Sequence, residues 1–284
     1  MAQAARTPTV DAHNHFWDIE RSDLYWMAPE APELARLRRS FTPPDLKPEM
    51  DAVGVDRSVI VQAARSRRGN LWWLELAERY DYVGAVVGWV DPEAPDVGTV
   101  LDEYRRHPAF RGVRTTAENV ADPDWLARPG VRRGIGEVAR RGLALDLLVR
   151  TEHLPHVPRL AEEHPDLRMV VDHLAKPPIA SGDLGLWRER LEALVPYPRV
   201  WCKVSGLLTE AGPEPTAERI RPVVEFALER FGAGRLMWGS DWPVCLLAAD
   251  YRTTYETVAA ALGPLPAADR AALFGGNAAR FYEL

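Results

Sequence analysis

The stretch TVDAHNH, residues 9–15, is a short β-forming run that ends in two histidines. Side chains two residues apart on a strand point to the same face, so His13 and His15 are expected to project together from the C-terminal end of this run. Two imidazoles side by side can hold a divalent metal ion when a third protein group lies opposite. A structural role, with one histidine packed and the other solvated, is equally compatible with this pair. The choice between the two interpretations depends on which other residues the fold brings to this point.

Seven further runs of the same kind follow along the chain. Each is short, apolar or β-branched and bounded by turn residues, which is the pattern of a strand. Several are continuously apolar, as is typical of strands that are covered on both faces. The runs occupy residues 57–62, 83–90, 110–115, 143–149, 168–174, 200–207 and 235–241.

Helical patterns fill the intervals between these runs. At residues 216–231, apolar side chains recur at helical spacing from Ile220 to Phe231, so one side of that helix is expected to face a core. Alternation of strand and helix predicts parallel βα units, and eight units favour a closed (β/α)8 barrel over an open doubly wound sheet. The other expected helices lie at residues 70–80, 96–106, 131–141, 154–163 and 183–194.

The length of the chain fits a single barrel. The chain has 284 residues, and such barrels typically need ~250. Because no repeat, low-complexity tract or linker interrupts the pattern, residues 1–284 are expected to form one TIM-barrel domain. Residues 18–40, which include Tyr25 and Trp26, are expected to pass over the barrel mouth. Residues 266–284 are expected to form a helical cap.

Charges of both signs are mixed along the chain, which carries a net charge of −6, and this argues against a nucleic-acid partner. No run approaches the ~20 apolar residues of a membrane helix, and residues 1–8 lack the apolar run of a signal peptide. We therefore expect a cytoplasmic protein that acts on a small molecule without a membrane partner; a homo-oligomer is compatible with the sequence. Cys202 and Cys245 lie in no CxxC spacing and are expected to be free structural thiols.

Two further polar side chains are expected to end strands at the same mouth. The segment GSDWP places Asp241 at the end of the last predicted strand, which neighbours the first strand in a closed barrel. The segment VDHLAKP places His173 at the end of the sixth predicted strand. Catalytic groups of such barrels lie at the C-terminal ends of the strands. We therefore interpret Asp241 as a ligand or general base beside His13 and His15, in preference to a helix cap, and we expect Asp172 to point toward the helices.

Four other side chains near strand ends are candidates for substrate binding. The fork of Arg114 suits a carboxylate or the oxygens of a lactone, with a salt bridge at the rim as the alternative. Lys203 lies inside the seventh predicted strand, where a buried lysine needs a partner, so substrate binding and an internal ion pair stay equally open. Trp26 and Trp242 suit the face of a sugar-like ring, with packing at the lip as the alternative.

These segments together resemble the amidohydrolase superfamily (amidohydrolase-related family 2). The similarity runs through the whole chain, toward the branch of L-fuconolactonases, L-rhamnonolactonases and 2-pyrone-4,6-dicarboxylate lactonases. It rests on the order and spacing of VDAHNHFWD, VVGWVD, RGVR, VVDHLAKP, WCKVSGL, GSDWPV and NAARFY. The resemblance implies an amidohydrolase-type barrel and hydrolysis at a carbonyl group.

The resemblance also implies a metal site on His13, His15, His173 and Asp241. The sequence departs from the fullest family pattern because Arg114 stands where a bridging lysine or glutamate would be, and the fifth strand has no histidine. We therefore expect one divalent ion, with zinc as the expected metal, and not two. A metal-free mechanism stays open, because some similar lactonases work without metal.

The hypothesis is that the chain opens a lactone of a sugar acid or a related small cyclic ester, in carbohydrate metabolism. The metal ion would orient and acidify a water molecule. Asp241 would take the proton of that water molecule and pass it to the leaving alkoxide, and His173 would polarise the carbonyl or hold the water. Arg114 and Lys203 would bind substrate oxygens. The alternatives are a metal-dependent decarboxylase of a small aromatic or unsaturated acid, and a non-catalytic binding protein, against which the His/His/His/Asp set argues.

Overall fold

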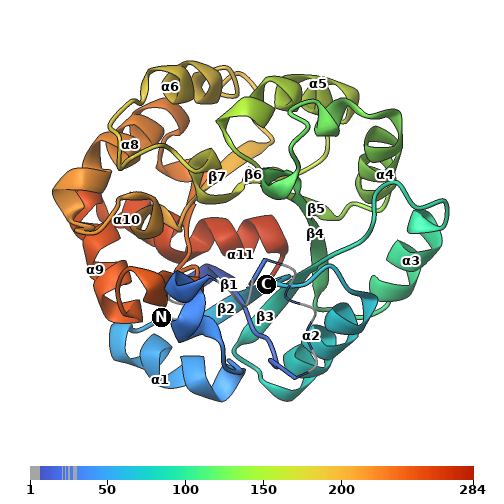
Figure 1. Cartoon of the computed structure of the whole chain (residues 1–284), viewed down its shortest axis with the longest axis horizontal. Coiled ribbons are helices and arrows are strands. Elements are labelled where there is room, and N and C mark those ends of the chain that lie inside the picture. The colour runs from blue at the N-terminus through green and yellow to red at the C-terminus, as the bar shows by residue number, and fades with distance from the viewer. Residues whose placement is uncertain (1–6, 21, 23, 25, 28–30) are drawn as a thin grey trace, which may run out of the picture.

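Eight parallel strands follow one another around a ring, and helices surround the ring (Figure 1). The arrangement comes from a computed structural model that describes residues 7–20, 22, 24, 26–27 and 31–284. Tyr25 and residues 1–6 lie outside the described residues. The predicted (β/α)8 barrel is confirmed.

Each predicted strand corresponds to an observed one. The predicted strands at residues 168–174 and 235–241 run too far, because the chain leaves the extended conformation before the polar residues that follow. The strands are β1 (Val10–Asn14), β2 (Arg57–Val61), β3 (Val83–Gly88), β4 (Phe110–Thr116), β5 (Ala144–Leu148), β6 (Met169–Val171), β7 (Val200–Val204) and β8 (Leu236–Trp238).

The ring closes between the ends of β8 and β1. The backbone N–H of Asp241 donates to the carbonyl of His13 at 2.8 Å, and the N–H of His15 donates to the carbonyl of Trp242 at 2.7 Å. Below these bonds, the buried Asp11 carboxylate accepts from the backbone N–H and the hydroxyl of Ser240. Closure therefore brings Asp241 beside His13 in β1 and His15 just after it, as the sequence predicts.

The expected helices are present, with boundaries shifted by a few residues. The predicted segment at residues 154–163 is split into a 3-10 turn, Thr151–His156, and a short helix. The helices are α1 (Pro43–Val53), α2 (Arg67–Arg79), α3 (Val97–Tyr104), α4 (Pro129–Arg140), α5 (Val157–Glu163), α6 (Gly185–Glu192), α7 (Leu207–Glu210), α8 (Ala217–Phe231), α9 (Tyr251–Leu262), α10 (Ala267–Ala271) and α11 (Asn277–Tyr282).

Local sequence sets the ends of α8 and its buried side. The Thr216 hydroxyl accepts a hydrogen bond from the backbone N–H of Arg219, which satisfies a free donor of the first turn. Gly232, with a φ of 68°, ends the helix in a conformation that suits glycine. Ile220 and Phe231 are buried, as the helical spacing predicts.

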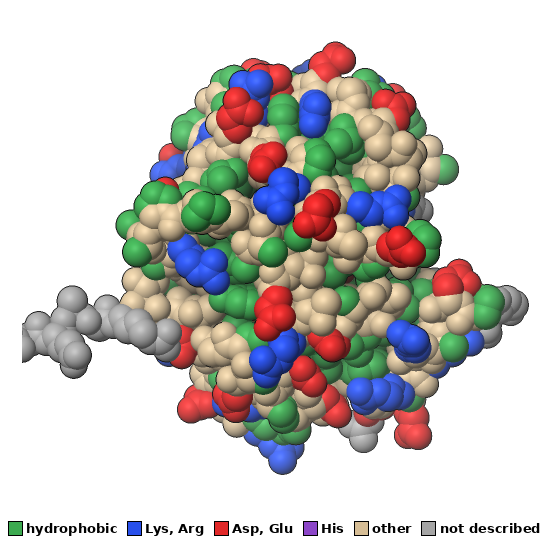
Figure 2. Space-filling view, turned by 90° about the vertical axis from the view of Figure 1, so that its left-hand side faces the viewer, with side chains coloured by type: hydrophobic (Ala, Val, Ile, Leu, Met, Phe, Trp, Pro, Cys, Tyr) green, Lys and Arg blue, Asp and Glu red, His purple; other side chains and the backbone are tan. Residues whose placement is uncertain are grey.

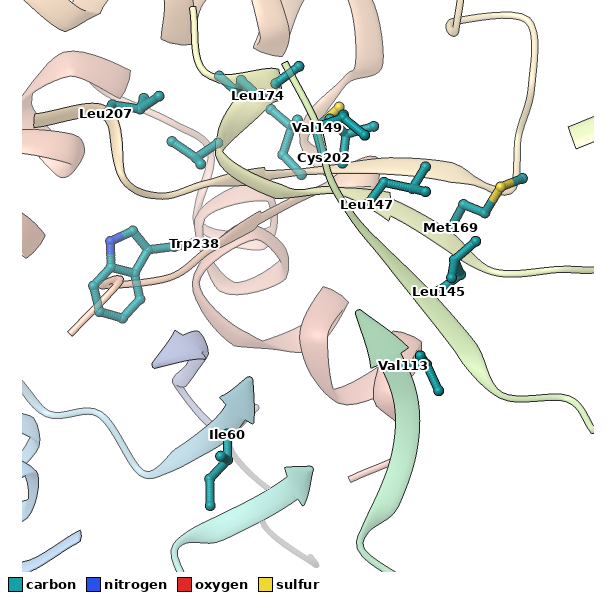
Figure 3. Close-up of a cluster of buried hydrophobic side chains, with 14 of the residues drawn as sticks. Ile60, Val113, Leu145, Leu147, Val149, Met169, Leu174, Cys202, Leu207 and Trp238 are labelled. Carbon is teal, nitrogen blue, oxygen red and sulfur yellow. The ribbon is translucent and has the colours of Figure 1, made fainter. Parts of the chain in front are cut away.

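An apolar layer joins the outer face of the strands to the helices. Figure 3 shows Leu145 and Leu147 of β5, Met169 of β6 and Cys202 of β7 in this cluster. Burial raises the pKa of the Cys202 thiol, so the thiol stays protonated and acts as a small apolar side chain. The structural role predicted for Cys202 agrees with this position.

The inside of the barrel has an apolar lower layer and a charged layer above it. Helix α11 lies across the ring in Figure 1 and closes its lower end. Phe281 and Tyr282 of this helix pack against inward-facing residues of the strands, namely Val10, Ala12, Val59, Val61, Ala85, Val87, Ala144, Val170 and Met237. The expected C-terminal cap is therefore present, built from α10, a π-helical turn and α11.

A β-bulge in β1 turns its histidines into the barrel. Val10 and Ala12 face the apolar interior, so plain alternation would send His13 to the outside. The pairing of β1 with β2 shifts register between Asp11 and Asn14, which adds one residue to β1. Such bulges re-aim side chains next to active sites. His13 and His15 therefore both face inward, with ring centroids 4.9 Å apart.

The outer surface carries charges of both signs. Figure 2 shows Lys and Arg side chains interspersed with Asp and Glu over the face in view. Among the described residues, no helix has the length and apolar character that crossing a membrane requires.

Candidate active site

Asp241 and three imidazoles meet at the mouth of the barrel. From Oδ1 of Asp241, Nε2 of His15 lies at 3.2 Å and Nε2 of His13 at 3.7 Å. Nε2 of His173 lies 3.8 Å from the same oxygen. All four side chains are buried. The convergence that the sequence predicts for strands one, six and eight is therefore present.

Two of these residues depend on an unusual backbone conformation. His173 has a φ of 54° and Asp241 a φ of 59°, both in the left-handed region that disfavours residues with a Cβ atom. The left-handed stretch continues through Leu174, Ala175 and Lys176. Such conformations persist only where the surroundings enforce them, and they cluster at functional sites.

The expectation that Asp172 points toward the helices is wrong. Val170 faces the barrel interior, so alternation places Asp172 inside as well. The Asp172 carboxylate lies 3.4 Å from Nδ1 of His13 and 3.7 Å from Nη1 of Arg114. His173 reaches the same interior because the chain turns left-handed at that residue. The sequence-based argument assumed an extended chain through both positions.

Lys203 is the centre of a buried ionic network below the mouth. Its ammonium group donates to Asp146 Oδ2 at 2.5 Å and lies 3.1 Å from Asp172 Oδ1. The ammonium group also lies 3.1 Å from Nδ1 of His13. Tyr282, from α11, donates its hydroxyl hydrogen to Asp146 at 2.8 Å. The side chains of Lys203 and both carboxylates have no exposed surface.

Two predicted substrate contacts are therefore wrong. Lys203 is fully enclosed by its ion pairs and does not line the cavity at the mouth, so it is the internal partner of Asp146 and Asp172. Trp242 is 2% exposed and packs edge-on between Phe16 and Phe41, at ring centroid distances of 5.9 and 5.2 Å. Its indole supports the lip of the barrel and offers no face to a ligand.

The donor atoms at the mouth fit one divalent ion. Ion–ligand bonds of ~2.0–2.2 Å place the ligand atoms of a tetrahedral site about 3.4 Å apart, close to the distances from Asp241 to the histidines. His15 donates its Nδ1 hydrogen to the Val61 carbonyl at 2.8 Å, so its Nε2 lone pair faces the site. His13, His15 and Asp241 form one candidate ligand set; His173 joins His13 and Asp172 in a second, overlapping set.

Arg114 lies beside one of the candidate metal ligands. Its Nη1 lies 3.4 Å from Nε2 of His13, and its Nη2 donates to the backbone carbonyl of Gln62. Its guanidinium group brings a permanent positive charge next to this candidate metal ligand.

Burial is the largest influence on the protonation of these groups. It lowers the pKa of His13 well below the ordinary histidine value, and the nearby Lys203 charge lowers it further. Burial would raise the pKa of Asp241, but the three histidines hold this carboxyl well below its usual range. The imidazole of His13 is therefore neutral at pH 7, and Asp241 is ionised.

A cavity of about 220 Å³ opens above Asp241. Arg114 and Trp26, both predicted as substrate contacts, line it, together with His15, His173 and Asp241. Trp26 belongs to the long connection after β1 and donates its indole N–H to the Ala63 carbonyl at 2.8 Å. The predicted excursion therefore contributes one wall of the site. Further lining residues are Leu34, Ala63, Glu118, Leu148, Arg150, Lys176, Val244 and Leu247.

Several polar residues of the site were missed by the sequence-based argument. Asp146 stood in the apolar run LALDLLV, where a lone carboxylate signals a buried partner. Glu118 and Lys176 lie in the loops after β4 and β6, and no pattern in the sequence relates two loops so far apart. Arg150 lies two residues after the end of β5, so its position near a strand end was a usable signal.

Gly206 lets two site residues approach each other. A Cβ atom at this position would lie 2.6 Å from Nδ1 of His173 and 3.2 Å from Oδ2 of Asp241, and the φ is +62°. Ser205, beside it, holds Nδ1 of His173 at 2.9 Å through its hydroxyl oxygen. The segment after β7 therefore fixes the position of His173.

Comparisons with known proteins show the family of the chain. The profile of the amidohydrolase family matches residues 10–284. The chain is 41% identical to the L-fucono-1,5-lactonase of Burkholderia ambifaria, over 97% of this chain and 95% of the relative. It is 37% identical to the L-fucono-1,5-lactonase of Burkholderia multivorans, over 97% and 96%. A crystal structure of a Burkholderia multivorans amidohydrolase with bound zinc superposes with a TM-score of 0.91 at 36% identity, over 98% and 99% of the chains.

Decarboxylases share the barrel at a greater distance. The structure of a 2,6-dihydroxybenzoate decarboxylase superposes with a TM-score of 0.70 at 16% identity, over 98% of each chain. A likeness at this level shows the fold alone.

The first prediction concerns the buried lysine. Replacing Lys203 with Met leaves Asp146 and Asp172 as uncompensated buried charges, which should lower the free energy of unfolding by about 3–5 kcal/mol. Urea denaturation measures this loss. Lys47→Met is the control, because Lys47 pairs with Asp51 on the surface and exposed pairs contribute little. Equal stability of the two variants would contradict the role given to the network.

The second prediction concerns the close approach at Gly206. Gly206→Ala and Gly142→Ala both place an alanine at positive φ, +62° and +66°, so each should cost about 1 kcal/mol of stability. Only the Cβ atom at position 206 meets site atoms, since nothing lies within 4 Å of the one at position 142. Gly206→Ala should therefore reduce kcat on the order of 10²-fold. Similar kcat values for both variants would show that His173 and Asp241 need no such placement.

Proposed function

This chain belongs to the amidohydrolase family and is a lactone hydrolase, and we propose that it opens the 1,5-lactone of a sugar acid with Asp241 as the group that takes the proton of the attacking water. The lactonase relatives cover almost the whole chain at 41% and 37% identity, which favours this reaction over decarboxylation. We propose a six-membered lactone ring because those relatives are L-fucono-1,5-lactonases.

The observation that carries the mechanism is the position of Asp241. Asp241 follows shortly after β8, and its carboxylate lines the cavity and lies within 4 Å of three imidazoles. It is ionised at neutral pH and can accept a proton. Among the described acidic residues that line the cavity, Glu118 is held by Lys176, so Asp241 is the carboxylate placed at the strand ends.

The reaction needs one proton acceptor that later becomes a donor. The water oxygen forms a bond to the lactone carbonyl carbon while its proton moves to Asp241. The bond between that carbon and the ring oxygen then breaks, and Asp241 returns the proton to the departing alkoxide. The product is the open hydroxy acid, and no oxidant or reductant is consumed. General acid–base catalysis of this kind typically contributes about 10²–10⁴-fold.

The low pKa of Asp241 makes it a weak base, so the site must also stabilise the negative charge that forms on the substrate. Arg114 lines the cavity and carries a permanent positive charge, and its guanidinium can donate to the carbonyl oxygen as that charge develops. His173, held by Ser205, presents Nε2 toward the same space and can hold the water or polarise the carbonyl.

We propose that His13, His15 and Asp241 hold one divalent ion, with zinc as the expected metal, in agreement with the zinc bound to the similar Burkholderia multivorans amidohydrolase. When bound, such an ion would supply Lewis acidity, which lowers the pKa of water and polarises a carbonyl oxygen. Asp172, 3.4 Å from His13 Nδ1, can accept the hydrogen of that nitrogen and leave the Nε2 lone pair for the ion.

The third prediction tests the proton acceptor. Asp241→Asn keeps the shape, and asparagine tolerates the positive φ of this position, so the fold should be retained. The variant cannot accept a proton, and kcat on the best sugar lactone should fall by roughly 10²–10⁴-fold. Proton release at saturating metal measures this, with CO2 release from aromatic acids followed in parallel. His173→Asn should lose less, and near-normal turnover by Asp241→Asn would show that the assigned mechanism is wrong.

The fourth prediction concerns metal content. Elemental analysis of the purified protein should find at most one equivalent of divalent metal per chain, because the permanent positive charge of Arg114, 3.4 Å from His13 Nε2, disfavours a second cation beside this histidine. Two equivalents would contradict this. His15→Ala should reduce the bound metal, since its Nε2 faces Asp241. Full activity of a completely metal-free protein would show that the residues act without an ion.

A further inference from the structure

An ion pair on the wall of the cavity has no part in the mechanism above. Nζ of Lys176 lies 2.7 Å from Oε2 of Glu118, and both side chains line the cavity that contains Asp241. Glu118 follows β4 and Lys176 follows β6, so the pair joins two loops at the mouth. Any ring seated above Asp241 lies in the same chamber as these two charges.

The ion pair of Glu118 and Lys176 is largely buried, and a second carboxylate lies beside the lysine on the side away from the cavity. The Glu118 side chain is 13% exposed and that of Lys176 is 20% exposed. Glu210, at the end of α7, lies 3.7 Å from Nζ of Lys176 and does not line the cavity. Two carboxylates thus fix the position of one ammonium group. An exposed surface ion pair is less fixed, so this arrangement suits a side chain that is positioned to bind a ligand.

The chemistry of the pair matches two neighbouring hydroxyl groups. A carboxylate accepts hydrogen bonds only, and an ammonium group donates up to three. A hydroxyl group both donates and accepts, so two adjacent ring hydroxyls can donate to Glu118 and accept from Lys176 at the same time. Hydrogen bonds to charged groups are the stronger kind, and they gain strength in a site partly closed to water.

The wall near the long connection after β1 supplies the complementary apolar contact. Trp26 lines the same cavity and its indole N–H is already engaged by Ala63. The ring of Trp26 is therefore available as an apolar surface for the C–H groups of a saturated ring. An aromatic wall combined with paired charged hydrogen-bonding groups suits a polyhydroxylated ring better than a plain aliphatic lactone.

We propose that Glu118 and Lys176 form a specificity pair that binds two adjacent hydroxyl groups of the substrate, so that the enzyme selects hydroxylated lactones over unsubstituted ones. This inference rests on the proposed function for the reaction itself. The pair lies outside the proton-transfer machinery, so its loss should affect which lactone is turned over more than whether a lactone is opened.

The experiment compares two lactones of the same ring size. L-fucono-1,5-lactone carries ring hydroxyls, and δ-valerolactone carries none. Glu118→Gln keeps the size of the side chain but removes its charge and one strong acceptor. It should lower kcat/KM for the hydroxylated lactone on the order of 10- to 100-fold, while kcat/KM for δ-valerolactone changes by about 2-fold or less. Lys176→Gln should shift the ratio of the two values in the same direction.

Glu210→Gln is the matched control. It also removes a negative charge from beside Lys176, but from a side chain that does not line the cavity, so the ratio should stay at the wild-type value. A purely structural role of the ion pairs would change both lactones equally in Glu118→Gln. Such an equal change, or an unchanged ratio, would overturn the inference.

Binding separates this inference from the proposed reaction. The 1,5-lactam of the same sugar acid keeps the hydroxyls, and its affinity can be measured by calorimetry without turnover. Glu118→Gln should weaken lactam binding on the order of 10-fold or more, and Glu210→Gln should not. If the wild type opens no sugar lactone, the proposed function fails, and the lactam affinities still decide the role of the pair. Equal lactam affinity in the wild type and Glu118→Gln would refute it.

Discussion

The buried charge of Lys203 is the constraint on which the site depends. An ammonium group with no exposed surface is strongly unfavourable unless nearby carboxylates neutralise it. Asp146 in β5 and Asp172 directly after β6 provide this neutralisation, and Tyr282 joins from α11. The network therefore requires that β5, β6, β7 and α11 keep fixed positions relative to one another. A barrel with any of these elements displaced would leave a charge unpaired in its interior.

The network also supports the strained residues above it. Asp172 belongs to the network, and the chain turns left-handed at the next residue to bring His173 into the barrel. Nδ1 of His13 lies 3.1 Å from the Lys203 ammonium group and 3.4 Å from the Asp172 carboxylate. The network therefore fixes the position of the His13 ring. Positions of this kind are retained only when the surroundings over-determine them. The rigid lower layer thus allows the mouth to present its imidazoles and an ionised carboxylate in fixed places.

The residues proposed for the reaction and those proposed for substrate choice come from different parts of the chain. The proposed proton acceptor and the candidate metal ligands lie at the C-terminal ends of the strands or within the few residues that follow. Glu118 and Lys176, which are proposed to bind the substrate hydroxyl groups, lie in the loops after β4 and β6. Trp26 lies in the long connection after β1. This separation allows lactonases, decarboxylases and other enzymes to share one barrel, because loops can change without disturbing the strand ends.

Local periodicity along the chain predicts the alternation of eight strands and their helices. Because parallel strands end at the same side of a barrel, it also predicts that His13, His15, His173 and Asp241 meet at one mouth. The orientation of single side chains near the strand ends could not be predicted in this way. The bulge in β1, the left-handed turn at His173 and the enclosure of Lys203 each break or override simple alternation. These features depend on packing and charge pairing between distant elements, and such contacts leave no signal in the local sequence of either partner.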